Sequence, residues 1–276
     1  MERFSQPKQN LEMFEPNMLG RLNSKANQVN RESSLNMEPF IDLYGMETVK
    51  RDYSEIAGKI LSFDTKPEGA ESIGHIFEAA FLDIGSRGQW FGENSELVRA
   101  SKYDDIKNGV DMIATTLTPD NSARHLAVAS DLTFSFPRAS EKLNRIVSQT
   151  YAGKLAEIKY FHSDLLHFTG KQSNVPRTVI GLEAQNLNRL FVNWLREPEL
   201  AQLQYGSIIM QQIAAQCEAL SFVAGSKQPN ARDAYRKVTD LAHILLRTSY
   251  KNIEAPEDKI LSSIQKHSDR LMTEFK

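Results

Sequence analysis

Two kinds of apolar spacing alternate along this chain, and each predicts a different secondary structure. Between residues 73 and 84 the apolar side chains recur three and four positions apart, which is the period of a helix with one buried face. Residues 108–117 and 125–135 are short segments rich in β-branched and apolar side chains, separated by the turn-like sequence TPDNSAR. These two segments predict a β-hairpin that follows the helix.

The remaining pattern divides the chain into three parts. Residues 1–40 are rich in Asn, Gln and Ser and lack a sustained apolar period, so we expect a flexible N-terminal arm. Residues 41–175 hold the helix and hairpin above, a further helix over 139–151 and a strand over 154–161, which together predict a mixed α/β (α+β) core. Helical spacing then continues to the end of the chain, so residues 176–276 are expected to form a helical subdomain. Its spine is expected to be the apolar helix between Leu200 and Val223.

Composition and charge narrow the class of protein. The 276 residues carry 33 Lys and Arg against 35 Asp and Glu, a net charge of −2, which excludes a uniformly basic nucleic-acid coat protein. The single cysteine, Cys217, cannot form an internal disulfide, so a cytoplasmic location is expected. No apolar run approaches the length of a membrane span, and the opening MERFSQPKQN has no apolar signal core. We therefore expect no membrane partner.

Two aspartates interrupt the predicted hairpin. Asp111 lies in the apolar sequence G-V-D-M-I and Asp131 in the sequence A-S-D-L-T. An acidic residue inside a buried strand is unfavourable unless it is paired, hydrogen-bonded or bound to a cation. Carboxylates on neighbouring strands supply the hard oxygen ligands that Mg²⁺ prefers, so the pair is a candidate site for Mg²⁺ or Mn²⁺. The competing explanation is that both aspartates cap strand ends or accept hydrogen bonds from backbone amides.

Residues 70–162 resemble the PD-(D/E)XK nuclease superfamily, whose restriction-endonuclease-like core runs α-β-β-β-α-β with a mixed sheet and acidic residues on a central hairpin. In YDDIKNGVDMI, Asp111 follows Gly109 and matches the family's first aspartate. In LAVASDLTFS, Asp131 matches the acidic residue of the (D/E)-x-K pair. The resemblance implies that both aspartates bind the metal and that Glu78, on the first helix, is a further catalytic acid. It also implies hydrolysis of phosphodiester bonds.

The sequence departs from the family pattern at Thr133, where the resemblance calls for a lysine. In the family this lysine positions or activates the attacking water and sometimes lies on the following helix, so Lys142 is the candidate for that role. An alternative pairs the strand of Asp111 with the predicted strand that holds the literal E-x-K of Glu157 and Lys159. Those two residues share one face of their strand and would then form the catalytic set with Asp111. We favour the two aspartates, because adjacent strands are usually joined by short connections.

Basic residues gather over 136–160 and 227–251, and clustered cations can hold phosphates even on a net-acidic chain. The residues expected to bind substrate are Arg138, Arg145, Arg232, Arg236 and Lys237. The leading hypothesis is a Mg²⁺-dependent nuclease that acts on DNA in preference to RNA. The alternative, favoured by Thr133, is a catalytically inactive nuclease-fold module that binds nucleic acid or a protein partner. The helical region also offers a surface for a homo-oligomer.

Overall fold

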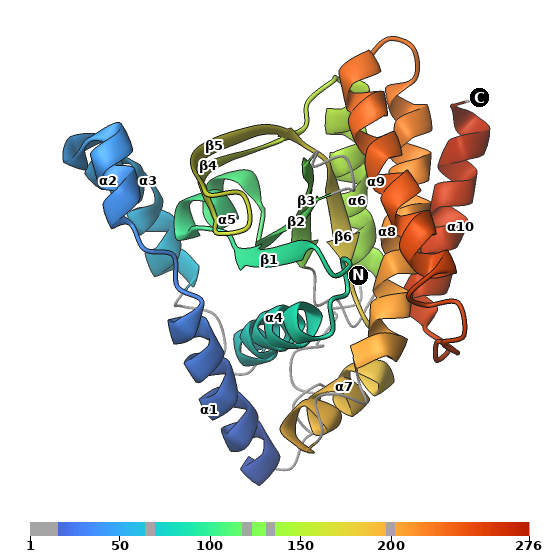
Figure 1. The fold of residues 1–276 in the computed structure, drawn as a ribbon, viewed down its shortest axis with the longest axis horizontal. Helices are drawn as coiled ribbons and strands as arrows, with labels where there is room; N and C mark the ends of the chain where they lie inside the picture. The colour runs from blue at the N-terminus through green and yellow to red at the C-terminus, as the bar shows by residue number, and fades with distance from the viewer. Residues whose placement is uncertain (1–15, 64–69, 118–122, 131–135, 197–201, 276) are drawn as a thin grey trace, which may run out of the picture.

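A four-stranded sheet surrounded by helices organises the molecule (Figure 1). The computed structural model describes residues 16–63, 70–117, 123–130, 136–196 and 202–275. The helices are α1 (Pro16–Glu32), α2 (Glu38–Tyr44), α3 (Met46–Phe63), α4 (Ala70–Arg87), α5 (Lys102–Asn108), α6 (Phe136–Tyr151), α7 (Ala184–Arg196), α8 (Gln202–Ala224), α9 (Pro229–Arg247) and α10 (Lys259–Glu274). The strands are β1 (Ser95–Arg99), β2 (Met112–Leu117), β3 (Ala123–Ser130), β4 (Ala156–Ser163), β5 (Phe168–Val175) and β6 (Arg177–Ile180).

The sheet is mixed, with the strand order β1-β2-β3-β6. Strands β1, β2 and β3 form an antiparallel meander, whereas β6 lies parallel to β3. The β2–β3 hairpin confirms the predicted pair of strands over 112–117 and 123–130, with Ile113 opposite Ala127. The first predicted segment begins too early, because Asn108 ends helix α5 and Asp111 precedes β2, and residues 131–135 of the second lie outside the described ranges. A parallel neighbour requires a long crossover connection, and the segment from α6 to β5 supplies it.

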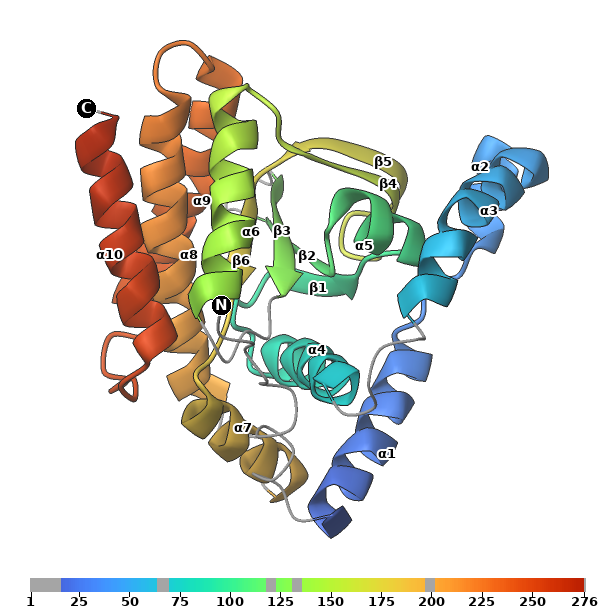
Figure 2. The same ribbon diagram turned by 180° about the vertical axis from the view of Figure 1, so that it is seen from behind.

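Helix α4 shows how the predicted pattern becomes a packed element. The apolar residues that recur along 73–84 are all fully buried, which confirms the predicted helix and its face. They belong to one large core that also includes residues of β2, α6, α7, α8 and α9. Figure 2 shows α6 alongside β6 and α8, with α4 below the sheet.

Strands β4 and β5 form a separate antiparallel sheet. This small sheet packs on the central one through a second apolar cluster that includes Val110, Ile113, Ile158 and Phe161. The strand predicted over 154–161 therefore exists, but it is not the fourth strand of the central sheet. That place is taken by β6.

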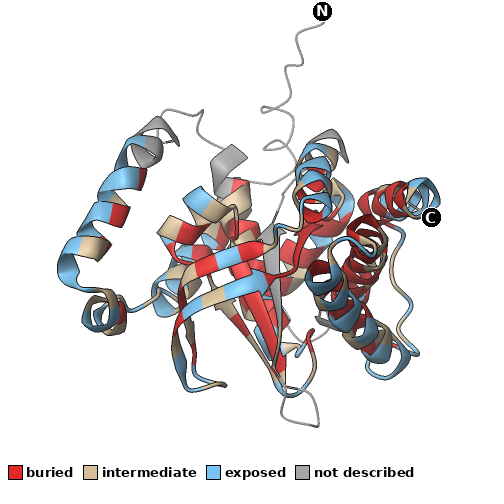
Figure 3. Ribbon diagram, turned by 90° about the horizontal axis from the view of Figure 1, so that it is seen from above, coloured by how far each residue is buried: buried red, intermediate tan, exposed pale blue. Residues whose placement is uncertain are grey.

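The expected flexible arm over residues 1–40 is wrong for its described part, and residues 1–15 lie outside the described ranges. Helix α1 buries Leu22 and Ala26 in the large core and packs against α4. Helices α2 and α3 continue from it, and Phe40 of α2 is fully buried. Figure 3 shows that α3, at the left edge, exposes most of its surface and buries isolated positions. The apolar residues of residues 16–40 are few, but they pack against the apolar clusters of the protein, so a mainly polar sequence is still held in place.

Residues 176–276 are not helical throughout, because β6 belongs to the central sheet. The expected boundary at 176 therefore falls just before an edge strand of that sheet. Helix α8 is the spine that its apolar sequence predicted: it packs against α9, α10, α6 and β6. Two buried glutamines join it to the sheet edge. Gln216 accepts from the Val179 N–H at 2.9 Å and donates to the Val179 carbonyl at 2.7 Å, and Gln212 bonds Gly181 in the same way. Helix α8 is therefore held between the sheet edge and the outer helices.

No helix in the described ranges is long and apolar enough to cross a membrane.

Candidate functional site

Asp111 lies at the point where the chain enters the central sheet. It is half-buried and directly precedes β2, and its carbonyl accepts a hydrogen bond from the Ala100 N–H at 3.0 Å. Because β2 and β3 are antiparallel with Met112 opposite Val128, β3 ends beside the residues that precede β2. Ser130 is the last residue of β3, and Asp131 and Thr133, which follow it in sequence, lie outside the described residues. The end of β3 and Asp111 therefore lie at the same end of the sheet.

A buried carboxylate fixes the turn that leads to Asp111. Asp104 is fully buried, and its Oδ1 accepts from the backbone N–H of Lys159 and from the Asn108 side chain, both at 2.8 Å. Its Oδ2 accepts from the Tyr160 N–H at 3.0 Å and from the Ser101 hydroxyl at 2.7 Å. Asp104 therefore ties α5 to β4. Helix α5 then ends at Gly109, whose φ of 62° is left-handed and favours glycine.

Two arginines converge on this turn from the other side of the molecule. A Cβ atom at Gly109 would lie 3.3 Å from Nη2 of Arg145, on α6, and 3.8 Å from Nη1 of Arg177, on β6. Lys142 is half-buried and lies three residues before Arg145 on α6, so the two share one side of the helix. Burial lowers the pKa of Arg177, and the nearby charge of Arg145 lowers it further. Two guanidinium groups therefore lie beside the turn that leads into β2.

Glu78 is engaged in an ion pair. Its carboxylate lies 3.3 Å from Nη1 of Arg99, at the end of β1, and Arg99 also donates to Asn30 of α1. Burial raises the pKa of Glu78 above its ordinary value, although Arg99 opposes the shift. Because Arg99 pairs with Met112 in the ladder, Glu78 and its partner lie beside the start of β2.

Glu157 and Lys159 lie on β4 and have separate partners. Glu157 is exposed and pairs with Lys171 of β5 at 2.8 Å. Lys159 donates to Asp52 of α3 and lies 5.5–5.7 Å from the centroids of nearby tyrosine rings. The alternative that pairs their strand with that of Asp111 is wrong, because β2 pairs with β1 and β3.

The other predicted substrate-binding residues lie on α6 and α9. Arg138 belongs to the first turn of α6, and its side chain lies outside the described part of the structure. Arg232 pairs with its neighbour Asp233 at 3.2 Å. Arg236 and Lys237 are exposed on α9.

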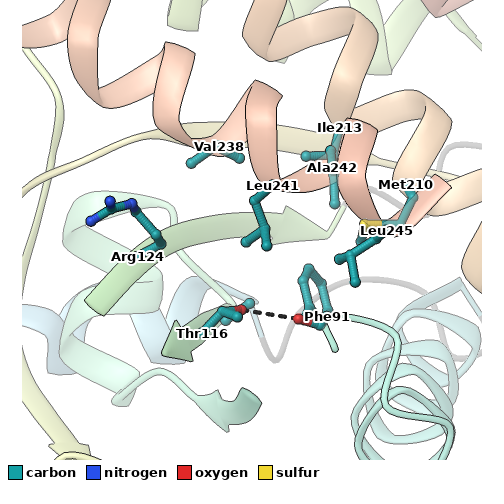
Figure 4. A pocket seen from close by; sticks show the side chains of 10 residues that line it. Phe91, Thr116, Arg124, Met210, Ile213, Val238, Leu241, Ala242 and Leu245 are labelled. Carbon is teal, nitrogen blue, oxygen red and sulfur yellow. Dashed lines mark hydrogen bonds between the residues drawn. The ribbon is translucent and has the colours of Figure 1, made fainter. Parts of the chain in front are cut away.

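Two hollows lie away from Asp111. The first, between the sheet and helices α8 and α9, has a volume of about 20 Å³, which is room for about one water molecule (Figure 4). Its walls are mainly apolar, and the Thr116 hydroxyl beside it donates to the Phe91 carbonyl at 3.1 Å. The second, of about 390 Å³, lies over α8 between α9 and α10 and includes His243 and Asp269 among its lining residues. Neither hollow brings together the groups predicted to carry chemistry.

Within the described ranges, no group of three or more His, Cys, Asp and Glu side chains is placed to hold a metal ion. This finding leaves the predicted aspartate pair open, because Mg²⁺ commonly uses only one or two carboxylates together with water and substrate phosphates.

Sequence reasoning missed Arg177, because the region after Pro176 was expected to be helical. The sequence V-P-R-T-V-I did carry a signal, since β-branched residues directly after a proline favour the start of a strand.

No family model, curated protein or solved structure matches this chain.

Proposed function

We propose that the protein is a Mg²⁺-dependent nuclease that hydrolyses phosphodiester bonds in DNA. The observation that carries the proposal is the meeting of three features at one end of the sheet. These are Asp111 at the start of β2, the end of β3 just before Asp131, and the cations Arg145 and Arg177. A carboxylate site flanked by cations suits a metal-assisted reaction on a phosphate.

The order of elements supports the same proposal. Helix α4, the meander β1–β2–β3, helix α6 and strand β6 follow the α-β-β-β-α-β order of the resembling family, and the sheet is mixed. Helix α5 and the β4–β5 hairpin are additions to that order. The fourth strand lies at 177–180, beyond the segment over which the sequence resemblance extends.

In the proposed site, Asp111 and Asp131 would hold the ion. The ion supplies polarisation of the scissile phosphate and a lower pKa for a bound water. Lys142 would stabilise the hydroxide that attacks. It lies on α6, the helix after β3, and in the resembling family the lysine sometimes lies on that helix. In this proposal Glu78 holds Arg99 beside the start of β2 and does not bind the ion, because its carboxylate is already paired with Arg99.

A catalytically inactive module that binds nucleic acid is the second candidate. Two observations favour it: Thr133 stands where the family pattern has lysine, and Glu78 is held by Arg99. In such a module the cations around Gly109 would still bind phosphates, while no cleavage would occur.

Cleavage of labelled DNA with Mg²⁺, Mn²⁺ or EDTA separates the two candidates. We expect metal-dependent cleavage by the wild-type protein and loss of cleavage by at least about a hundred-fold in Asp111→Asn and in Asp131→Asn. Asp240→Asn is the matched control, because Asp240 is exposed on α9. Wild-type protein that binds DNA but cuts with none of the metals would favour the inactive module. Equal cleavage by Asp111→Asn and Asp240→Asn would overturn the proposed site.

A further inference from the structure

Arg177 is a buried cation that carries no acidic counter-group within the described residues. Its exposed fraction is 7%, and its guanidinium donates to the Asn108 carbonyl and to the Gln149 side-chain oxygen, both of which are neutral. Its Nε has no hydrogen-bond partner among the described groups. A buried charge is unfavourable unless it is paired, and the described surroundings of Arg177 lack a negative group to pair with it.

Arg145 adds a second cation at the same place. It is exposed on α6, and no ion pair joins it to a carboxylate in the described part of the chain. Both guanidinium groups lie within 4 Å of where a Cβ atom of Gly109 would be. Glycine therefore keeps the space between them and the turn clear of a side chain.

We propose that Arg145 and Arg177 bind one phosphate of the nucleic-acid strand, held against the turn at Asn108–Gly109. The inference rests on the proposed function, and it names Arg177 as a positioning residue for the substrate. Guanidinium groups match the oxygens of a phosphate with paired, charge-assisted hydrogen bonds. Since Gly109 lies two residues before Asp111, this phosphate is a neighbour of the one that is cut.

The test measures binding without cleavage. Anisotropy of a fluorescein-labelled DNA duplex in EDTA gives the dissociation constant of each variant over a series of salt concentrations. For Arg145→Gln we expect affinity about ten-fold weaker, as for the loss of one charge-assisted contact. The slope of log affinity against log salt should become shallower by about 0.9. Arg145→Lys should restore the slope, because it keeps the charge.

Arg189→Gln provides the matched control, since Arg189 is an exposed arginine on α7. It should leave both affinity and slope at wild-type values. Arg177→Lys and Arg177→Gln extend the test to the buried partner, with the melting temperature measured alongside. Arg177→Gln should weaken binding more than Arg177→Lys at a temperature where both are folded.

Each outcome decides the inference separately from the proposed function. Wild-type affinity and slope in Arg145→Gln would overturn it, even if the protein cuts DNA. The expected loss of binding would support it, even if no metal produces cleavage.

Discussion

Asp104 gives the sharpest stability prediction, because one buried carboxylate accepts four hydrogen bonds from α5 and β4. In Asp104→Asn the amide oxygen can keep the two donors of one carboxylate oxygen. In either orientation the new NH₂ group faces a backbone N–H, that of Tyr160 or that of Lys159, together with one side-chain donor. Charge-assisted hydrogen bonds contribute about 1.5–3 kcal/mol each, so losing two of them should lower the free energy of unfolding by about 3–6 kcal/mol.

Urea denaturation followed by circular dichroism measures this loss, and the adjacent residue provides the control. Asp105 pairs with Lys102 at 3.3 Å, and both side chains are exposed. Asp105→Asn should therefore cost less than about 1 kcal/mol. The reasoning would be refuted if the two variants lost the same stability within error, because Asp104 would then be no more than a solvated helix residue.

Two further predictions concern other buried contacts. Burial alone would raise the pKa of Asp52, but hydrogen bonds from Lys159 and Tyr160 hold it below the ordinary 3.8. The ionised carboxylate therefore stabilises the folded protein above that pH, and this stabilisation is lost as the pH falls through the lowered pKa. Asp52→Asn should thus be about 3 kcal/mol less stable at neutral pH by urea denaturation, with the deficit shrinking in acid; a deficit independent of pH would contradict this. Gly206→Ala should lower the melting temperature, since its Cβ would lie 2.5 Å from the Tyr250 hydroxyl and overpacking costs about 1–3 kcal/mol. Gly20→Ala, which meets nothing within 4 Å, should instead stabilise the protein, and equal effects would contradict the packing argument.

The sequence predicted structure best where the period of its apolar residues matched one buried face of a helix or strand. Helix α4 and the β2–β3 hairpin could be predicted because each buries a regular face, which local spacing records directly. Asp111 could be singled out for the same reason: it breaks an apolar run. Its position beside the end of β3 then follows from the antiparallel register.

The remaining features depend on tertiary contacts that spacing does not record. Strand β6 is short, and part of its edge bonds the glutamine side chains of α8 rather than another strand. Helix α1 has a mainly polar sequence and is held by a few buried residues such as Leu22. Arg177 reaches the turn at Gly109 across 68 positions of sequence, since 177 − 109 = 68. Such long-range placements require the fold itself.

The central claim is that Asp111 and Asp131 share one metal ion at the start of β2. The most direct measurement is a crystal structure of the protein with DNA and Mn²⁺, with the metal located by its anomalous signal. We expect one peak about 2.1 Å from carboxylate oxygens of both aspartates, with a DNA phosphate completing its coordination. A structure in which the Asp131 carboxylate points away from Asp111, or in which the metal binds elsewhere, would contradict the account.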